Sequence, residues 1–464
     1  MPTLVRRDAP ILPTMLNHIS ALALTFAFCT VSASVTVRKT SQGPTGYEVD
    51  FHYYNASAQE VTIAGGFTTF TDQYHAIVTG SASYDPHDYQ PGWFRGVGAN
   101  NTPAFLPYHM VSDGNGNWNY TTPLPSGTYS YAFLVDCPPT DSCTIDTGRY
   151  VIDQDNPPFQ NVQEQIASRF QVPFDPDFQS YEDLNLDFDY QLPVPEEHQG
   201  TVTNVNYSSP GSVLPAPDIH DFAVYLPKEY GTIQGKQYHL MYLSHGGGGD
   251  GQDWENLAAV SHILDRLIMD GHIPPTVVVM PSFYNIEPQY NFTYGSSAGS
   301  VAPSAQVVRE NYMAYLFPFV QANFAVSSDP AMRGFSGLSL GSILTYEMFI
   351  NATDYFDYYG LFSGVLGPTA TQYAYFNASQ LAARPSVLTK GIFTCAGLYD
   401  IAFNDVRSLQ TAFQALGVPY LSRYAPYGYH YWNTWADCMW RYGQTVLWRP
   451  LPLPANPIVQ PRMA

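Results

Sequence analysis

Hydrophobic and polar residues follow two different periods along the chain, and the shorter period comes first. Between residues 47 and 53, Tyr, Val, Phe and Tyr alternate with Glu, Asp and His, which is the pattern of a half-buried β-strand. Residues 61–67 and 128–136 predict further strands, and turns rich in Gly, Asn and Pro separate them. We therefore expect a small β-sandwich over residues 35–160.

A pattern of alternating strands and helices begins near residue 198. Between the strands, apolar residues recur at helical spacing, as in residues 254–271. This alternation predicts an α/β fold with a doubly wound sheet over residues 198–448, after an acidic linker at 161–197 and before a Pro-rich tail at 449–464. Short apolar runs typical of buried parallel strands occur at residues 222–227, 239–245, 276–283 and 391–397.

The N-terminus has the features of an export signal. Its apolar stretch, residues 19–31, is too short to span a bilayer comfortably and ends in small residues at 32–34. We expect residues 1–34 to be a signal peptide and the mature protein to be secreted. Seven glycosylation sequons agree with export: Asn55, Asn100, Asn119, Asn206, Asn291, Asn351 and Asn377.

Four cysteines remain once Cys29 is removed with the leader, and an even number in an exported chain favours disulfides. Four cysteines allow three pairings. We favour Cys137–Cys143, a local link, together with Cys395–Cys438, and free thiols are the alternative.

The charge balance excludes two classes of partner. The formal net charge is −20, and the chain has only 19 Lys and Arg residues, without a basic stripe. Nucleic acids and anionic membrane surfaces both require clustered positive charge, so neither is an expected partner. No cluster of His, Cys and Asp at ligand spacing predicts a metal, no cofactor is expected, and we expect a monomer.

The strongest chemical motif is a G-x-S-x-G sequence centred on Ser339. In this motif a serine leaves a strand on a sharp turn, so the positions two residues away, here Gly337 and Gly341, have no room for a side chain. The helix that follows directs its first N–H groups toward the serine. We expect Ser339 to be a nucleophile and the Leu340 N–H to contribute to an oxyanion hole. The alternative is an ordinary strand-to-helix turn.

A second motif, His245 followed by four glycines, comes directly after the strand predicted at 239–245. Glycines let the backbone approach a substrate closely, as in the oxyanion loops of esterases. We expect Gly247 and Gly248 to donate N–H groups to the oxyanion, and His245 to brace the loop. A phosphate-binding loop is the alternative, but the G-K-[ST] ending is missing.

An acid and a base follow in the order that hydrolases use, which is serine, then acid, then histidine. Asp400 comes directly after the apolar run 391–397, and Asp405 is a local competitor that we expect to lie in the next helix. Of the twelve histidines, only His430 follows Ser339 in the chain. We therefore expect Ser339, Asp400 and His430 to form a catalytic triad on an α/β-hydrolase fold.

These motifs resemble those of carbohydrate esterase family 1, which includes feruloyl esterases and acetyl xylan esterases. The resemblance covers residues 198–448, and it departs from the family at Ser342, where a second glycine is usual. It implies a serine esterase that removes feruloyl or acetyl groups from plant cell-wall xylan. We favour feruloyl esters because aromatic residues surround His430. The segments that carry the resemblance to the family are 242–254, 333–342, 356–364, 396–400 and 427–432.

The N-terminal part resembles a family 48 carbohydrate-binding module in residues 61–70, 115–136 and 151–158. If the resemblance holds, Trp93 and Phe94 are the best candidates for stacking on sugar rings. The alternative for this domain is a structural cap on the enzyme. The alternatives for the whole chain are an acyltransferase with the same triad and an inactive carbohydrate-binding protein.

Overall fold

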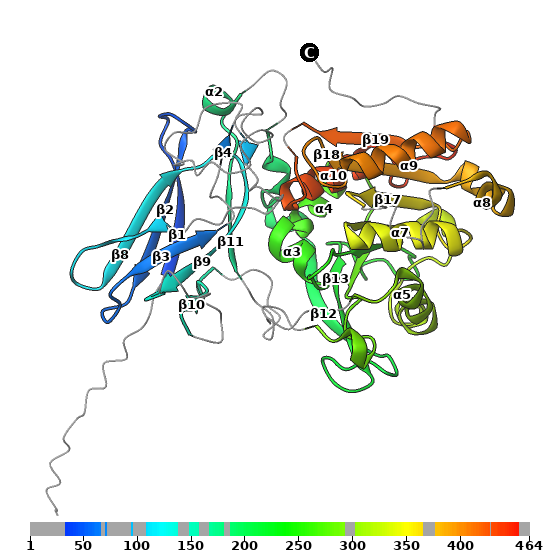
Figure 1. The fold of residues 1–464 in the computed structure, drawn as a ribbon, viewed down its shortest axis with the longest axis horizontal. Coiled ribbons are helices and arrows are strands. Elements are labelled where there is room, and N and C mark those ends of the chain that lie inside the picture. Colours follow the sequence, from blue (N-terminus) through cyan, green and yellow to red (C-terminus); the bar gives the residue numbers. More distant parts are fainter. Residues whose placement is uncertain are drawn as a thin grey trace, which may run out of the picture.

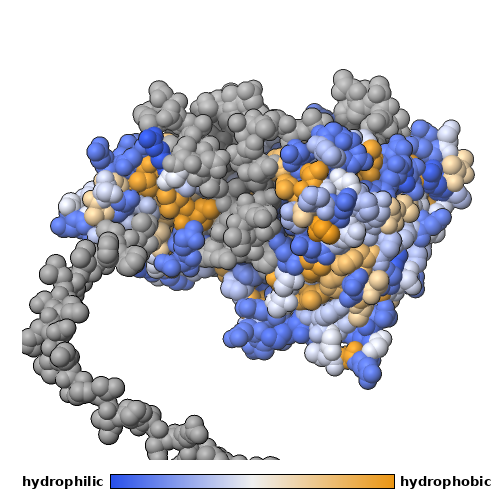
Figure 2. All heavy atoms as spheres, turned by 90° about the horizontal axis from the view of Figure 1, so that it is seen from below, coloured by the Kyte–Doolittle hydropathy of each residue, from blue (hydrophilic) through white to orange (hydrophobic). Residues whose placement is uncertain are grey.

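The computed structural model describes residues 33–65, 70–71, 94–95, 108–137, 148–156, 167–180, 186–292, 302–364, 376–426 and 428–453. A β-sandwich and an α/β domain lie side by side (Figure 1). Each domain has hydrophobic residues at its surface on the side that faces the other domain (Figure 2). The predicted signal peptide lies outside the described residues, except for Ala33 and Ser34 at the start of the first strand.

The sandwich consists of two antiparallel sheets around one hydrophobic core. Strand order is β1-β2-β8-β7 in one sheet and β10-β9-β3-β6 in the other, where β11 also pairs with β9. Two further short strands, β4 (Phe70–Thr71) and β5 (Phe94–Arg95), pair with each other. The first sheet contains β1 (Ala33–Lys39), β2 (Tyr47–Tyr54), β7 (Val111–Ser112) and β8 (Asn117–Pro123). The second contains β3 (Val61–Gly65), β6 (Tyr108–His109), β9 (Gly127–Val135), β10 (Tyr150–Val151) and β11 (Ser168–Val172).

The sandwich extends past residue 160, where the sequence predicted a linker to begin. Strand β11 pairs with β9 from Ser168 opposite Tyr131 to Val172 opposite Gly127. Its alternating residues Ser168, Phe170 and Val172 are buried, so this segment has the period of a strand. In the described part of the predicted linker after β11, the regular elements are the short helices α2 (Pro176–Gln179), η3 (Asp189–Gln191) and η4 (Glu196–His198).

The α/β domain is built on one eight-stranded sheet, in the order β12-β13-β15-β14-β16-β17-β18-β19. The two strands at the β12 edge are antiparallel to their neighbours and the other six are parallel. This confirms the predicted α/β fold. The strands are β12 (Thr201–Ser208), β13 (Ile219–Leu226), β14 (His239–Ser244), β15 (Thr276–Pro281), β16 (Arg333–Leu338), β17 (Tyr358–Phe362), β18 (Gly391–Gly397) and β19 (Leu421–Ala425).

Helices cover both faces of this sheet, which explains why its strands are apolar throughout. In β15, Val277 and Val279 enter one hydrophobic core, whereas Val278 and Met280 enter the other. The first core includes residues of α5 (Ala305–Asn311), α6 (Phe317–Asn323), α7 (Leu340–Asn351) and α9 (Phe403–Ala415), with the π-helical turn η6 (Tyr312–Leu316). The second includes residues of α3 (Asp253–Ala258), α4 (Val260–Met269) and α10 (Trp432–Thr445). The remaining short helices are η5 (Pro288–Tyr290), η7 (Pro330–Met332), α8 (Ala378–Ala383) and η8 (Pro385–Thr389).

A disulfide joins Cys395 in β18 to Cys438 in α10, which confirms one of the two predicted pairs. Cys137 is also disulfide-bonded, but its predicted partner Cys143 lies outside the described residues. Among the helices of the described ranges, none is long and apolar enough to cross a membrane.

Candidate active site

Ser339 occupies the sharp turn between strand β16 and helix α7. Its backbone has φ 51° and ψ −117°, a left-handed conformation that is costly for a residue with a side chain. The flanking glycines make the turn possible. A Cβ on Gly337 would lie 2.5 Å from the Gly341 carbonyl oxygen, and a Cβ on Gly341 would lie 2.3 Å from the His245 carbonyl oxygen. Both glycines are therefore required by close packing, as the motif predicts.

The glycine loop begins at the end of the strand next to the serine. Strands β14 and β16 are parallel neighbours, and Ser244 pairs with Gly337. Parallel strands end at the same edge of a sheet, so the loop after β14 lies against the turn after β16. A Cβ on Gly246 would lie 3.3 Å from the Cβ of Ser339. The two motifs predicted separately thus meet at one place.

His430 links the serine to the acid. Its Nε2 lies 3.0 Å from Ser339 Oγ and its Nδ1 lies 2.8 Å from Asp400 Oδ1. The histidine lies between β19 and α10, one residue before the N-cap of that helix, and Thr434 Oγ1 in α10 donates to the Tyr429 carbonyl and fixes the backbone. Its ring packs edge-on against Trp435, and its side chain is 15% exposed. The structure therefore brings together the three side chains predicted as a triad.

Asp400 lies just beyond the end of β18, and its carboxyl group is fully buried. Besides the contact with His430, Oδ1 accepts a hydrogen bond from the Ala402 N–H at 2.8 Å, and Oδ2 accepts one from Ser363 Oγ at 2.6 Å. A carboxylate held in this way accepts a hydrogen bond from the Nδ1–H of the imidazole, which leaves the Nε2 lone pair directed toward the serine hydroxyl.

Ser363 was not predicted from the sequence. It is fully buried directly after strand β17, with φ 50°, and its N–H donates to the Cys395 carbonyl at 2.7 Å. The only sequence signal is its place at the carboxyl end of a strand beside the one that leads to Asp400. Ser342, the departure from the family pattern, is also buried, and its Oγ lies 2.6 Å from where a Cβ on Gly364 would be.

Two of the three predicted oxyanion donors lie together. A Cβ on Gly247 would be 3.0 Å from Leu340 Cδ1, so this part of the loop faces the start of α7. Within the described ranges, neither the Gly247 nor the Leu340 N–H donates to a protein acceptor. The third predicted donor differs, because the Gly248 N–H donates to the Tyr284 hydroxyl at 3.0 Å. The Gly248 amide is therefore hydrogen-bonded to the loop after β15. The motif alone could not predict this contact, because the two residues are far apart in the chain.

His245 supports the glycine loop rather than the chemistry. Its ring is completely buried and stacks on Phe283 with ring centroids 4.0 Å apart. Its Nε2 accepts from the Phe283 N–H, which places the proton on Nδ1, 2.7 Å from the Gly246 carbonyl. Burial lowers the pKa of His245 to about 4, so the ring is neutral at pH 7. This agrees with the structural role expected from the sequence.

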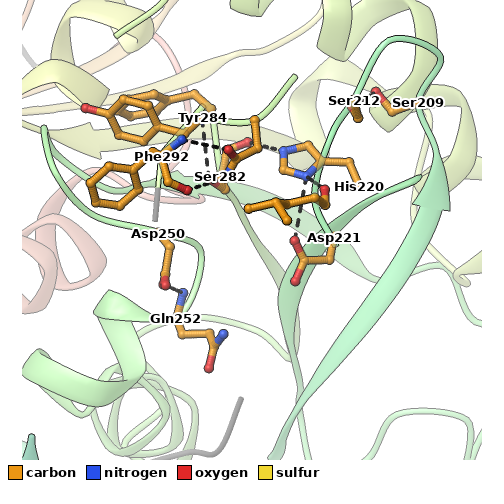
Figure 3. Close-up of polar contacts among 12 residues, drawn as sticks. Ser209, Ser212, His220, Asp221, Asp250, Gln252, Ser282, Tyr284 and Phe292 are labelled. Atoms are coloured by element: carbon orange, nitrogen blue, oxygen red, sulfur yellow. Dashed lines mark hydrogen bonds and ion pairs between the residues drawn. The ribbon is translucent and has the colours of Figure 1, made fainter. Parts of the chain in front are cut away.

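A second polar cluster holds the segment after β15 that contacts the glycine loop (Figure 3). The ring nitrogens of His220 lie 3.2 and 3.1 Å from the carbonyl oxygens of Leu214 and Ser282, and burial lowers the pKa of His220 to about 4. Ser282 directly precedes Phe283 and Tyr284, which contact the glycine loop. In the same cluster, burial and then the nearby charge of Asp250 raise the pKa of Asp221 to about 6.

The other predicted residues lie elsewhere. Asp405, the competing acid, is in the first turn of α9, as expected. Trp93 lies outside the described residues, and Phe94 is in β5, where only the backbone is described. No group of three or more His, Cys, Asp or Glu side chains in the described ranges is placed to share a metal ion.

Comparison with known families supports an ester hydrolase. Residues 218–446 match the Esterase family model, described as "Putative esterase". The match contains all three side chains of the hydrogen-bonded Ser339–His430–Asp400 chain, together with the glycine loop.

Proteins similar to this chain include enzymes named for xylan. The chain is 34% identical over 145 residues to an endo-1,4-beta-xylanase/feruloyl esterase of Xylanibacter ruminicola, covering 30% of this chain and 19% of that protein. It is 28% identical over 207 residues to endo-1,4-beta-xylanase Y of Acetivibrio thermocellus, covering 42% of this chain and 18% of that protein. The chain thus spans about a fifth of the length of these two relatives. A solved feruloyl esterase module from Clostridium thermocellum complexed with sinapinate is 22% identical, with a TM-score of 0.45, covering 56% of this chain and 92% of that one.

Proposed function

We propose that the protein is a serine carboxylesterase that hydrolyses feruloyl esters on plant cell-wall xylan. One observation carries the proposal: His430 makes hydrogen-bonding contacts with Ser339 Oγ through Nε2 and with Asp400 through Nδ1. A base within reach of a hydroxyl, itself oriented by a buried carboxylate, is the arrangement that activates a serine nucleophile.

The first half of the reaction acylates the serine. Ser339 Oγ attacks the ester carbonyl carbon while its proton passes to His430 Nε2. The carbonyl oxygen becomes an oxyanion that the Leu340 and Gly247 N–H groups can stabilise, and each such donor is worth about 3–4 kcal/mol in other hydrolases. The tetrahedral intermediate then breaks its bond to the alcohol oxygen, and His430 returns the proton to that oxygen.

The second half releases the acid. Water gives a proton to His430 Nε2 and attacks the acyl carbon, and the bond to Ser339 Oγ then breaks as the serine regains the proton. Asp400 stabilises the imidazolium in both halves. An acyltransferase would differ only in the second half, where a sugar hydroxyl would replace water.

Support for the substrate comes from the relatives and the setting of His430. A relative at 34% identity is named a xylanase/feruloyl esterase. Tyr429, Tyr431 and Trp432 adjoin His430 in the chain, and the Tyr429 and Tyr431 rings stack 5.4 Å apart. We further propose that the enzyme is secreted, in accord with its leader and sequons, and that Trp93 and Phe94 contact carbohydrate.

The test compares methyl ferulate with p-nitrophenyl acetate as substrates of the purified protein. We expect Ser339→Ala to lower kcat/KM at least about 1000-fold without loss of fold. Asp400→Ala and Asp405→Ala form a matched pair, because they are the two candidate acids, and only the first should inactivate. Full activity of Ser339→Ala would refute the mechanism. Acyl transfer to xylo-oligosaccharides in preference to water would favour the acyltransferase.

A further inference from the structure

A cavity lies between the two domains, and its lining includes Tyr431 and Trp432, the two residues that follow His430 in the chain. Its volume is about 460 Å³, within the range of small-molecule sites. The sandwich contributes Ser130, Leu134 and Tyr150, and the esterase domain contributes Leu257, Tyr431 and Trp432. None of the described residues that line it carries a charge. The cavity therefore suits a neutral ligand with a ring that can stack on aromatic side chains.

The sandwich sheet is built to be covered on this side. In β9, Phe133 and Val135 enter the sandwich core, whereas Ala132 and Leu134 lie on the opposite face. A sheet face exposed to water would carry polar residues at these positions. Ala132 is fully buried although it lies outside the sandwich core. The face is therefore an interface within the molecule.

Polar contacts hold the esterase domain against this sheet. Arg169 of β11 donates to the carbonyl of Glu255 in α3, and its guanidinium lies 3.4 Å from the carboxylate of the same residue. Both side chains are largely buried, at 14% and 7% exposure. In α4, a ring nitrogen of His262 lies 2.8 Å from the carbonyl oxygen of Gln191, and Gln171 of β11 donates to that same carbonyl. The walls of the cavity thus have a fixed relation to each other.

The chemistry of the active site says which part of an ester faces the cavity. His430 must return its proton to the leaving alcohol oxygen, so the alcohol part of the ester lies on the His430 side of Ser339. The carbonyl oxygen points instead toward the Leu340 and Gly247 N–H groups. Tyr431 and Trp432 follow His430 directly and line the cavity. Because the segment that carries His430 continues into this lining, an alcohol part that passes His430 would extend toward the cavity.

We propose that this cavity binds the sugar residues of the ester's alcohol part, so that the sandwich forms one wall of the substrate site. This proposal rests on the proposed function, because xylan esters are the substrates whose alcohol is a sugar. The aromatic rings of Tyr150 and Trp432 offer surfaces for the C–H faces of a pentose ring. Hydroxyl groups such as that of Ser130 can pair with those of the sugar.

The experiment compares two feruloyl esters that differ only in the alcohol, namely methyl ferulate and a feruloylated arabinoxylan oligosaccharide. Ser130→Phe fills the cavity from the sandwich side. We expect the ratio of kcat/KM for the oligosaccharide ester to kcat/KM for methyl ferulate to fall at least 10-fold, mainly through KM. The control is Val111→Phe in β7, which is 71% exposed in the other sheet and should leave the ratio unchanged.

A binding measurement separates this proposal from the enzymatic one. The Ser339→Ala protein is titrated with an unesterified arabinoxylan oligosaccharide, and adding Ser130→Phe should weaken binding at least 10-fold. If the unmodified enzyme cleaves neither ester, the proposed function fails, and this titration still decides whether the cavity takes sugar. If Ser130→Phe does not fold, Tyr150→Ala replaces it. Unchanged affinity and ratio would overturn the proposal, as would a parallel loss on both esters with normal oligosaccharide binding, which would indicate an acyl pocket.

Discussion

Replacing Ser363 with alanine removes one hydroxyl from the buried side of Asp400 and leaves the rest of the active site in place. The hydroxyl donates to Oδ2 at 2.6 Å, and the carboxyl group is fully buried, so water cannot take over the contact. A hydrogen bond to a charged group contributes about 1.5–3 kcal/mol. We therefore expect Ser363→Ala to lower the free energy of unfolding by about 2 kcal/mol, measured by urea denaturation.

The same substitution should slow the reaction, because the carboxylate faces an imidazolium in the transition state. If the transition state loses between half and all of this stabilisation of about 2 kcal/mol, kcat falls by about 5- to 30-fold. The assay is methyl ferulate hydrolysis, with KM expected to stay near its normal value. Ser336→Ala is the matched control, since this serine is also fully buried and lies on the neighbouring strand β16. Normal activity of Ser363→Ala would refute the argument that this serine positions Asp400.

Three further predictions test the packing, the charge and the cross-link. Gly341→Ala should lower kcat/KM more than about 100-fold and destabilise the fold by about 1–3 kcal/mol, because its Cβ would lie 2.3 Å from a carbonyl of the glycine loop; wild-type kinetics would contradict this close approach. Asp221 is protonated in the folded state up to pH about 6, so it stabilises the fold below its unfolded pKa of about 3.8, and this contribution is lost as pH rises through about 6. Asp221→Asn should therefore raise the free energy of unfolding by about 3 kcal/mol at pH 7 and by almost nothing below pH 4, and an equal gain at both would exclude this cause. Replacing Cys395 and Cys438 together by alanine opens a cross-link with a sequence separation of 43 and should cost about 4 kcal/mol in the unfolding free energy; a midpoint equal to that of the oxidised parent would argue against it.

Local sequence patterns were sufficient to predict those elements and site residues whose structure depends mainly on residues nearby in the chain. The apolar runs at 239–245 and 276–283 predicted buried strands because both faces of the sheet are covered. The glycines around Ser339 predicted the sharp turn because a side chain at either position would clash. His430 could be singled out because no other histidine follows the serine.

Features that depend on distant contacts could not be predicted in this way. Acidic residues after position 172 hid strand β11, whose alternation is only five residues long. Apolar residues on either side of Ala259 pack into the same core, so the spacing concealed the left-handed break there between α3 and α4. Ser363 matters because two strands bring it to Asp400, and Gly248 is occupied by Tyr284, 36 residues away.

The disulfide joins the strand that leads to Asp400 with the helix that follows His430. The chain between the two cysteines, which carries α9 and β19, is therefore a closed loop whose two ends are pinned together. Gly417 lies in the turn after α9, and a Cβ there would meet no atom within 4 Å. A peptide or affinity tag inserted at this turn would extend into solvent, while the disulfide kept Asp400 and His430 close to each other. The turn is therefore a suitable attachment point for immobilising the protein.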